Sequence, residues 1–190
     1  MSVDLGIYEK AMPESFSFKE KLALARRAGF NYLEISIDES DKKLSRVFDA
    51  STRREFVSAA KNSDIRVKTM CLSGHRRFPL GSHDAKTRKK SLELMQAAID
   101  FALDAGVRII QLAGYDVYYE EGDDFTRAAF AENLAKCAEM AARAGVYMGF
   151  ETMETEFMNT ATKAKHYVDM INSPYLKIYP DMGNIRNATE

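Results

Sequence analysis

Three segments of the chain share one pattern, an Ala-Gly pair followed by a run of apolar residues. They span residues 26–36, 103–113 and 142–152. Each pattern predicts a helix that ends at the glycine and leads into a strand, because glycine readily adopts the left-handed conformation that often follows a last helical turn. The apolar runs lack strict alternation, which is typical of strands that are covered on both faces.

The remaining apolar positions complete a regular alternation of strands and helices. Helical spacing and capping residues predict five helices, at 17–28, 49–62, 84–105, 123–144 and 160–172. Apolar runs predict six strands, at 5–12, 30–36, 65–72, 107–112, 146–151 and 175–181. This alternation predicts a parallel α/β sheet, either open and doubly wound or closed as a (β/α)8 barrel. The barrel is favoured, because no strand is followed by the glycine-rich loop typical of nucleotide-binding open sheets.

The chain is short for a complete barrel. It has 190 residues, whereas eight units with the spacing of these six need about 250–280 residues. The last ten residues, 181–190, follow the sixth strand and are expected to form a loop. We therefore expect a single partial TIM-barrel domain over residues 1–190, with about six strands and five helices, that is truncated at its C-terminus.

Charge and cysteine content exclude several classes of protein. Lys and Arg number 27 against 28 Asp and Glu, so the net charge of −1 disfavours nucleic acid as the main ligand. Cys71 and Cys137 lie far apart and outside any CxxC pattern, which argues against a disulfide framework or a thiolate zinc site. The sequence shows neither a signal peptide nor a long apolar segment, so we expect a cytoplasmic protein with no membrane partner.

The chemistry of a barrel lies at the C-terminal ends of its strands. The polar residues at those places are Glu9, Glu34, Asp38, His75, Arg76, Arg77, Tyr115, Asp116, Glu151, Glu154 and Asp181. Glu151 and Asp181 end neighbouring strands, and two facing carboxylates repel unless a divalent cation or a proton lies between them. A metal site is the economical interpretation, although each acid could instead be a helix cap, a turn residue or a solvated loop residue.

Two loops carry further candidate binding residues. In 71–82, Gly74 is followed by His75, Arg76 and Arg77, a combination that suits phosphate or another small anion but could equally be a basic surface cluster. In 114–124, Tyr115 lies close to two further tyrosines, Tyr118 and Tyr119; such a loop can line a sugar site or an oligomer interface, or simply pack. The spacing gives His83 and His166 no role.

Several longer strings point to one family. They are LGIYEKAMP, LEISIDESDKKLSR, MCLSGHRRFPLGS, IQLAGYDVYYEE, ETME followed by FMNT, and IYPDMGN. Together, from about residue 5 to 187, they resemble the L-ribulose-5-phosphate 3-epimerases, also called L-xylulose-5-phosphate 3-epimerases, within the xylose-isomerase-like barrel superfamily.

The resemblance implies an isomerase that inverts C3 of a 2-ketopentose 5-phosphate by metal-assisted deprotonation and reprotonation through an enediolate, in the breakdown of L-ascorbate or a related L-sugar. It implies that Glu151 is the catalytic acid/base and a metal ligand, that Asp181 is a metal ligand, and that the cofactor is a divalent ion such as Zn or Mn, with no organic cofactor. The binding partner is then a sugar phosphate, and a homodimeric assembly is compatible with the resemblance. From their charge we assign His75, Arg76 and Arg77 to the phosphate, with Tyr115 beside them.

The resemblance also limits what this chain is expected to do. The family's other ligands, a His on the seventh strand and a second catalytic Glu on the eighth, would lie beyond residue 190, so we expect the chain to be impaired or inactive. The alternative is a non-catalytic barrel fragment that self-associates or complements a separate C-terminal piece through its open strand edges. A metal-dependent endonuclease of the same superfamily is disfavoured by the three histidines and the net charge of −1.

Overall fold

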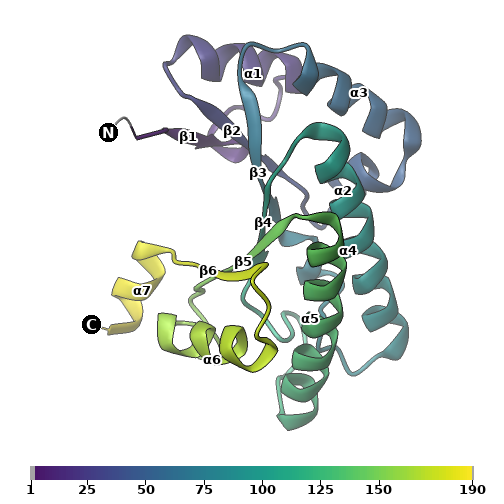
Figure 1. Ribbon diagram of the computed structural model, residues 1–190, viewed down its shortest axis with the longest axis vertical. Coiled ribbons are helices and arrows are strands. Elements are labelled where there is room, and N and C mark those ends of the chain that lie inside the picture. The colour runs from purple at the N-terminus through teal and green to yellow at the C-terminus, as the bar shows by residue number, and fades with distance from the viewer. Residues whose placement is uncertain (1–2, 190) are drawn as a thin grey trace.

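The computed structural model describes residues 3–189 and contains one parallel sheet. Its strands are β1 (Gly6–Tyr8), β2 (Tyr32–Ser36), β3 (Arg66–Leu72), β4 (Ile109–Ala113), β5 (Tyr147–Glu151) and β6 (Leu176–Tyr179). Each strand pairs in parallel with its neighbour in sequence, in the order β1-β2-β3-β4-β5-β6. The sheet curves into an arc with β1 and β6 at its two ends (Figure 1). The predicted six-stranded incomplete barrel is confirmed.

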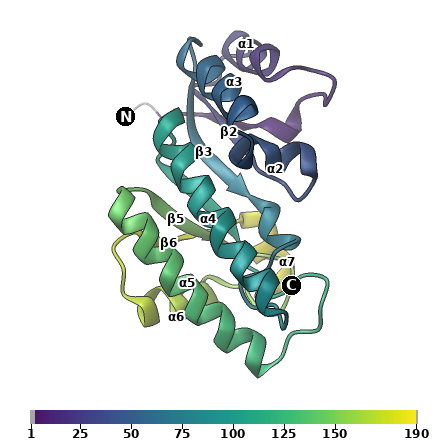
Figure 2. The same ribbon diagram turned by 90° about the vertical axis from the view of Figure 1, so that its right-hand side faces the viewer.

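The helices follow the strands in alternation. They are α1 (Phe18–Arg27), α2 (Asp41–Phe48), α3 (Ala50–Lys61), α4 (Ala85–Ala105), α5 (Asp124–Ala144), α6 (Ala161–Ile171) and α7 (Met182–Thr189), with two 3-10 turns, η1 (Glu9–Ala11) and η2 (Ser73–Arg76). Viewed from the helix side, α4 and α5 lie next to each other in front of the strands (Figure 2). No helix within residues 3–189 has the length and apolar character needed to cross a membrane.

The predicted helix ends are confirmed where glycine stops the helix. Gly29, Gly106 and Gly145 have φ values of +85°, +79° and +67°, each in the left-handed region. A side chain at these positions would strain the backbone, which explains why the same Ala-Gly pattern recurs before a strand.

Two helices were not predicted, so the expected number of five is wrong. In α2 only Leu44 and Val47 supply buried apolar side chains, too few positions for a helical period to be recognised. The expected loop at 181–190 is also wrong, because α7 begins at once. Asp181 caps it, accepting a 2.8 Å hydrogen bond from the Asn184 amide at Oδ1.

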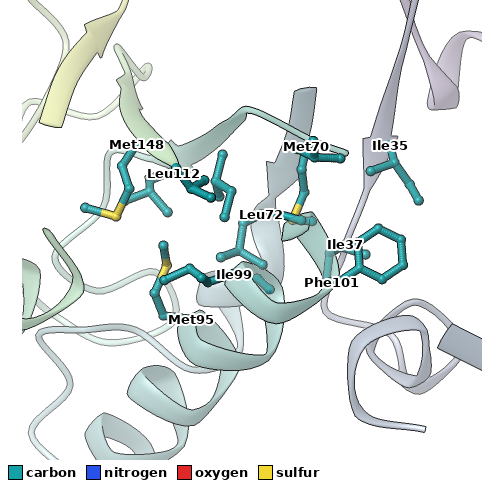
Figure 3. Close-up of a cluster of buried hydrophobic side chains, with 14 of the residues drawn as sticks. Ile35, Ile37, Met70, Leu72, Met95, Ile99, Phe101, Leu112 and Met148 are labelled. Carbon is teal, nitrogen blue, oxygen red and sulfur yellow. The ribbon is translucent and has the colours of Figure 1, made fainter. Parts of the chain in front are cut away.

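The hydrophobic core lies between the sheet and the helices on its convex face. Figure 3 shows part of this core, where strand side chains meet those of α4. The strands contribute Ile35, Met70, Leu72, Leu112 and Met148, and α4 contributes Met95, Ile99 and Phe101. The helices thereby fix the strand positions and leave the other, concave face of the sheet to polar side chains.

Candidate active site

The concave face of the sheet carries a set of polar side chains. Side chains alternate between the two faces of a strand, and the residues next to Glu34, Gln111 and Glu151 belong to the core on the convex face. Glu34, Gln111 and Glu151 therefore project from the concave face, on β2, β4 and β5.

Glu151, the last residue of β5, lies half-buried at the centre of this set. The Gln111 amide donates a hydrogen bond to its Oε2. Burial, together with the negative charges of Asp181 and Glu34, raises the pKa of Glu151 from 4.5 to about 7, against the opposing effects of Arg76 and the Gln111 hydrogen bond. Glu151 can therefore take up and release a proton near neutral pH, as a general acid/base must.

Asp181 follows β6 and is fixed by the chain around it. Its backbone amide donates a 2.9 Å hydrogen bond to the Thr152 hydroxyl. Its Oδ1 caps α7, and the side-chain amide of Asn184 donates to the Thr152 carbonyl at 2.9 Å. These contacts join the ends of β5 and β6 and fix Asp181 where its charge acts on Glu151.

The donor set suits a hard divalent cation. Glu151 and Asp181 offer carboxylate oxygens, and the pKa of Glu151 is raised by its partial burial and then by the charge of Asp181, a repulsion that a cation would relieve. Within residues 3–189 no group of three His, Cys, Asp or Glu side chains is arranged to hold a metal ion. The predicted pair is therefore compatible with a metal, but it supplies only part of a coordination shell.

Of the predicted basic triplet, only Arg76 lies near Glu151. Its guanidinium is 5.8 Å from the centre of the Tyr115 ring and 5.1 Å from that of Tyr118, and its Nε is buried without a hydrogen-bond partner. Arg76 also interacts electrostatically with Glu151 and Asp38. An arginine that lies against two adjacent aromatic rings and has an unpartnered Nε is suited to binding an anion.

His75 and Arg77 point elsewhere. The His75 ring is buried with Nε2 3.2 Å from the Ser91 carbonyl, and burial lowers its pKa to about 4, so it is neutral at pH 7. Arg77 is exposed and pairs with Asp41 at 2.6 Å. The structure thus does not bring either residue to the face that carries Glu151, because the 3-10 turn η2 directs the three consecutive side chains differently.

The remaining strand-end residues have local partners. Tyr115 lies beside Arg76 and donates a 3.0 Å hydrogen bond to Glu154. Asp116 accepts a 2.6 Å hydrogen bond from Thr126, and Asp38 pairs with Lys10. Glu9 is fully buried within an ion-pair cluster and does not join the candidate site.

Sequence reasoning missed Gln111, Thr152, Tyr179 and Asn184. Gln111 is the one polar residue in the run IIQLA of β4, a usable signal in a strand buried on both faces. Asn184 follows Asp181 by three residues, the spacing of an N-cap contact. Thr152 carries no signal in the pattern, because its contacts with Asp181 and Asn184 depend on how the ends of β5 and β6 are aligned. Tyr179 carries none either, because its hydrogen bond to Glu34 joins β6 to β2 across the sheet.

Comparison with known proteins agrees with this architecture. Residues 22–190 match the model of the xylose isomerase-like TIM barrel family. The chain is 46% identical over 184 residues to L-ribulose-5-phosphate 3-epimerase UlaE of Salmonella heidelberg (strain SL476), covering 96% of this chain and 65% of that protein. The chain therefore spans just under two thirds of the length of that relative.

Solved structures share the fold at low sequence identity. A D-allulose 3-epimerase from Methylomonas sp., crystallised with D-allulose, superposes with a TM-score of 0.78 at 20% identity, over 97% of this chain and 64% of that one. The IolI protein with a bound zinc atom superposes with a TM-score of 0.76 at 15% identity, over 96% and 64%. With the match of the family model to most of its length, this chain belongs to the xylose isomerase-like TIM barrel family.

Proposed function

We propose that the chain belongs to an isomerase that inverts C3 of a 2-ketopentose 5-phosphate, L-ribulose 5-phosphate or L-xylulose 5-phosphate. The observation that carries the proposal is Glu151, a carboxyl group at the end of β5 with its pKa raised to about 7 beside Asp181. The 46% identity to an L-ribulose-5-phosphate 3-epimerase supports the choice of substrate.

Glu151 would act on the proton at C3. That C–H is acidified by the neighbouring C2 carbonyl, so a carboxylate that titrates near neutrality is a suitable base, and the protonated acid can return the proton. Inversion needs proton transfer on both faces of the intermediate, and Glu151 serves one of them.

Glu151 and Asp181 would hold a divalent cation, Zn or Mn, with no organic cofactor. Bound there, the cation would act as a Lewis acid that stabilises negative charge on the substrate oxygens. The capping contact from Asn184 and the hydrogen bonds to Thr152 would keep the Asp181 carboxylate in place for this role.

The substrate phosphate would bind at Arg76, with Tyr115 beside it. Of the four residues predicted to bind phosphate, this proposal keeps Arg76 and Tyr115 and leaves out His75 and Arg77. Arg76 has a buried Nε without a partner, whereas Arg77 is paired and His75 is neutral. The proposal includes breakdown of L-ascorbate or a related L-sugar in the cytoplasm, a homodimeric assembly, and no nucleic acid or membrane as partner.

Proton exchange at C3 tests the proposal more directly than net epimerisation, because exchange requires one base only. The purified chain is incubated with L-ribulose 5-phosphate and Mn²⁺ or Zn²⁺ in D2O, and loss of the C3 proton signal is followed by NMR. We expect exchange that Glu151→Gln abolishes. Glu156→Gln, which removes an exposed carboxylate in the following loop, serves as the matched control and should retain it. Exchange no faster than in the Glu151→Gln variant would contradict the proposal.

A second function is a non-catalytic fragment that self-associates or complements a separate C-terminal piece. It is favoured by the outer edges of β1 and β6, which pair with no other strand among residues 3–189. Light scattering coupled to size-exclusion chromatography tests for self-association. A monomer at all protein concentrations would argue against it.

A further inference from the structure

We propose that Gln111 is a positioning residue for Glu151, and this inference rests on the role of Glu151 in the proposed function. Gln111 donates to Oε2 of the Glu151 carboxylate, and in the proposed function Oε1 would then be left for substrate or metal. Gln111 is not among the candidate residues predicted from the strand ends or from the basic and aromatic loops.

The register of the sheet places the two side chains together. Gln111 is paired with Gly149, and Ala113 is paired with Glu151, so Gln111 stands two residues before the level of Glu151 on the adjacent strand. A Cβ added at Gly149 would lie 3.0 Å from Tyr179 Cβ, so the absence of a side chain there leaves room for Tyr179 on β6.

The orientation of the amide is dictated by charge. Gln111 is only 4% exposed, and its Nε2 donates to Glu151 Oε2. Reversing the amide would direct its oxygen at a carboxylate oxygen, which repels it. Gln111 Oε1 is buried without a hydrogen-bond partner among the described residues.

A side chain that orients a metal-binding or catalytic carboxylate has a measurable effect. Removing such an outer partner commonly reduces metal affinity or activity by about 10- to 100-fold, because the carboxylate is then free to rotate. A group that merely fills the core would instead affect stability and leave the affinity unchanged.

The test compares Gln111→Met with Thr69→Val. Methionine keeps the length of the side chain and removes the donor. Thr69 is a buried strand residue with an unpartnered hydroxyl, and Val preserves its shape, so it is the matched control. Mn²⁺ affinity is measured from the EPR signal of the free ion, C3 exchange with varied substrate gives kcat and KM, and thermal melting reports folding.

For Gln111→Met we expect Mn²⁺ affinity and the kcat of exchange to fall about 10- to 100-fold, with KM within about twofold and a melt close to that of the control. Unchanged Mn²⁺ affinity and unchanged exchange in a folded Gln111→Met variant would overturn the proposal.

An NMR measurement tests the contact without metal or substrate. The Gln111 side-chain amide is assigned by its loss in Gln111→Met, and a downfield proton shift is expected from its bond to a carboxylate. Glu151→Ala should remove that shift, and Asp181→Asn should leave it in place. If the chemical shift of the Gln111 amide does not change in Glu151→Ala, the positioning role is overturned. If the wild-type chain neither binds Mn²⁺ nor exchanges C3, the proposed function fails, and the amide shift still decides whether Gln111 holds Glu151.

Discussion

The Tyr179 hydroxyl donates a 3.2 Å hydrogen bond to Glu34, and this bond links β6 to β2 across the concave face. Burial and the negative charge of Glu34 raise the pKa of Tyr179, so the phenol stays protonated and remains a donor. Glu34 in turn contributes to the raised pKa of Glu151. Acids on β2, on β5 and after β6 thus form one electrostatic unit on the concave face.

Asp181→Asn should stabilise the metal-free chain at alkaline pH. The pKa of Glu151 is raised from 4.5 to about 7, so the folded state retains a proton that the unfolded state has lost, and stability declines as pH rises through that window. Asparagine keeps the Oδ1 cap on α7 and removes one source of the shift. We expect a higher Tm than wild type near pH 8 and a smaller difference near pH 4.5, with about 2–4 °C for each kcal/mol.

The same variant should bind Mn²⁺ more weakly, since it loses a ligand charge. Asp169→Asn, at a surface pair with Lys165 on α6, is the control and should change neither property. A lower Tm for Asp181→Asn at both pH values would show that the two carboxylates do not repel each other in the folded chain.

Glu9→Gln should destabilise the fold strongly. Glu9 is fully buried and pairs with Arg46 at 2.6 Å, Lys43 at 2.7 Å and Lys21 at 3.5 Å. Removing the one acid leaves buried cations uncompensated, which costs about 3–5 kcal/mol. Asp104→Asn, which breaks the more exposed pair with Arg53, should cost no more than about 1 kcal/mol. Urea unfolding measures both, and equal losses in the two variants would contradict the structural role of Glu9.

The Glu9 cluster also predicts acid sensitivity. Burial alone would raise the pKa of Glu9, but hydrogen bonds and charges from Arg46 and Lys43 lower it from 4.5 to about 2. Because the folded pKa lies below the unfolded one, the stability that the cluster supplies is complete above pH 4.5 and is lost as pH falls toward 2. The slope of unfolding free energy against pH in this range should be reduced in Glu9→Gln.

Arg76→Met should weaken binding of the phosphorylated sugar. A hydrogen bond to a charged group contributes about 1.5–3 kcal/mol, so we expect the Kd of L-ribulose 5-phosphate to rise about tenfold or more. Unphosphorylated L-ribulose should bind equally to both proteins. Arg77→Met removes the same charge from a side chain that already pairs with Asp41, and calorimetry should find its affinity unchanged. Equal weakening by both substitutions would indicate a general effect of charge.

His83 should titrate above its ordinary pKa. Its Nδ1 lies 3.1 Å from Glu120 Oε2 and its Nε2 lies 3.0 Å from Asp123 Oδ2, so both ring nitrogens face carboxylates. Hydrogen bonds that the protonated ring donates to Asp123 and Glu120 raise the pKa of His83 above its ordinary value of 6.5. The folded pKa is the higher one, so these contacts stabilise the chain fully below pH 6.5 and are lost as pH rises through the folded pKa.

NMR titration of the His83 ring measures this effect. Asp123→Asn should lower the midpoint toward 6.5, whereas Asp124→Asn at the next position should leave it unchanged. A wild-type midpoint at or below 6.5 would mean that the two carboxylates do not engage the ring in solution.

The alternation of strands and helices could be predicted because the long helices show a clear helical spacing of apolar residues. Three of these helices also end at a glycine that precedes an apolar strand. The short helix α2 could not be predicted, since two buried apolar residues give no period. Among site residues, Glu151 and Asp181 were recognisable as acids at adjacent strand ends. Arg76 could not be separated from His75 and Arg77, because the turn that directs the three side chains differently follows from packing of η2 against α4. Gln111 could not be predicted either, because its contact with Glu151 depends on the register between β4 and β5.

The order of the sheet bears on how the chain folds. Every strand pairs with the next strand in sequence, so each pairing closes a short loop. The bond between Tyr179 and Glu34 spans 145 residues, and closing a loop of that length costs roughly 1–2 kcal/mol more entropy than closing one of about 30 residues. Folding should therefore proceed by successive addition of neighbouring units. The acids of the concave face would come together only in the last step, after β6 has docked.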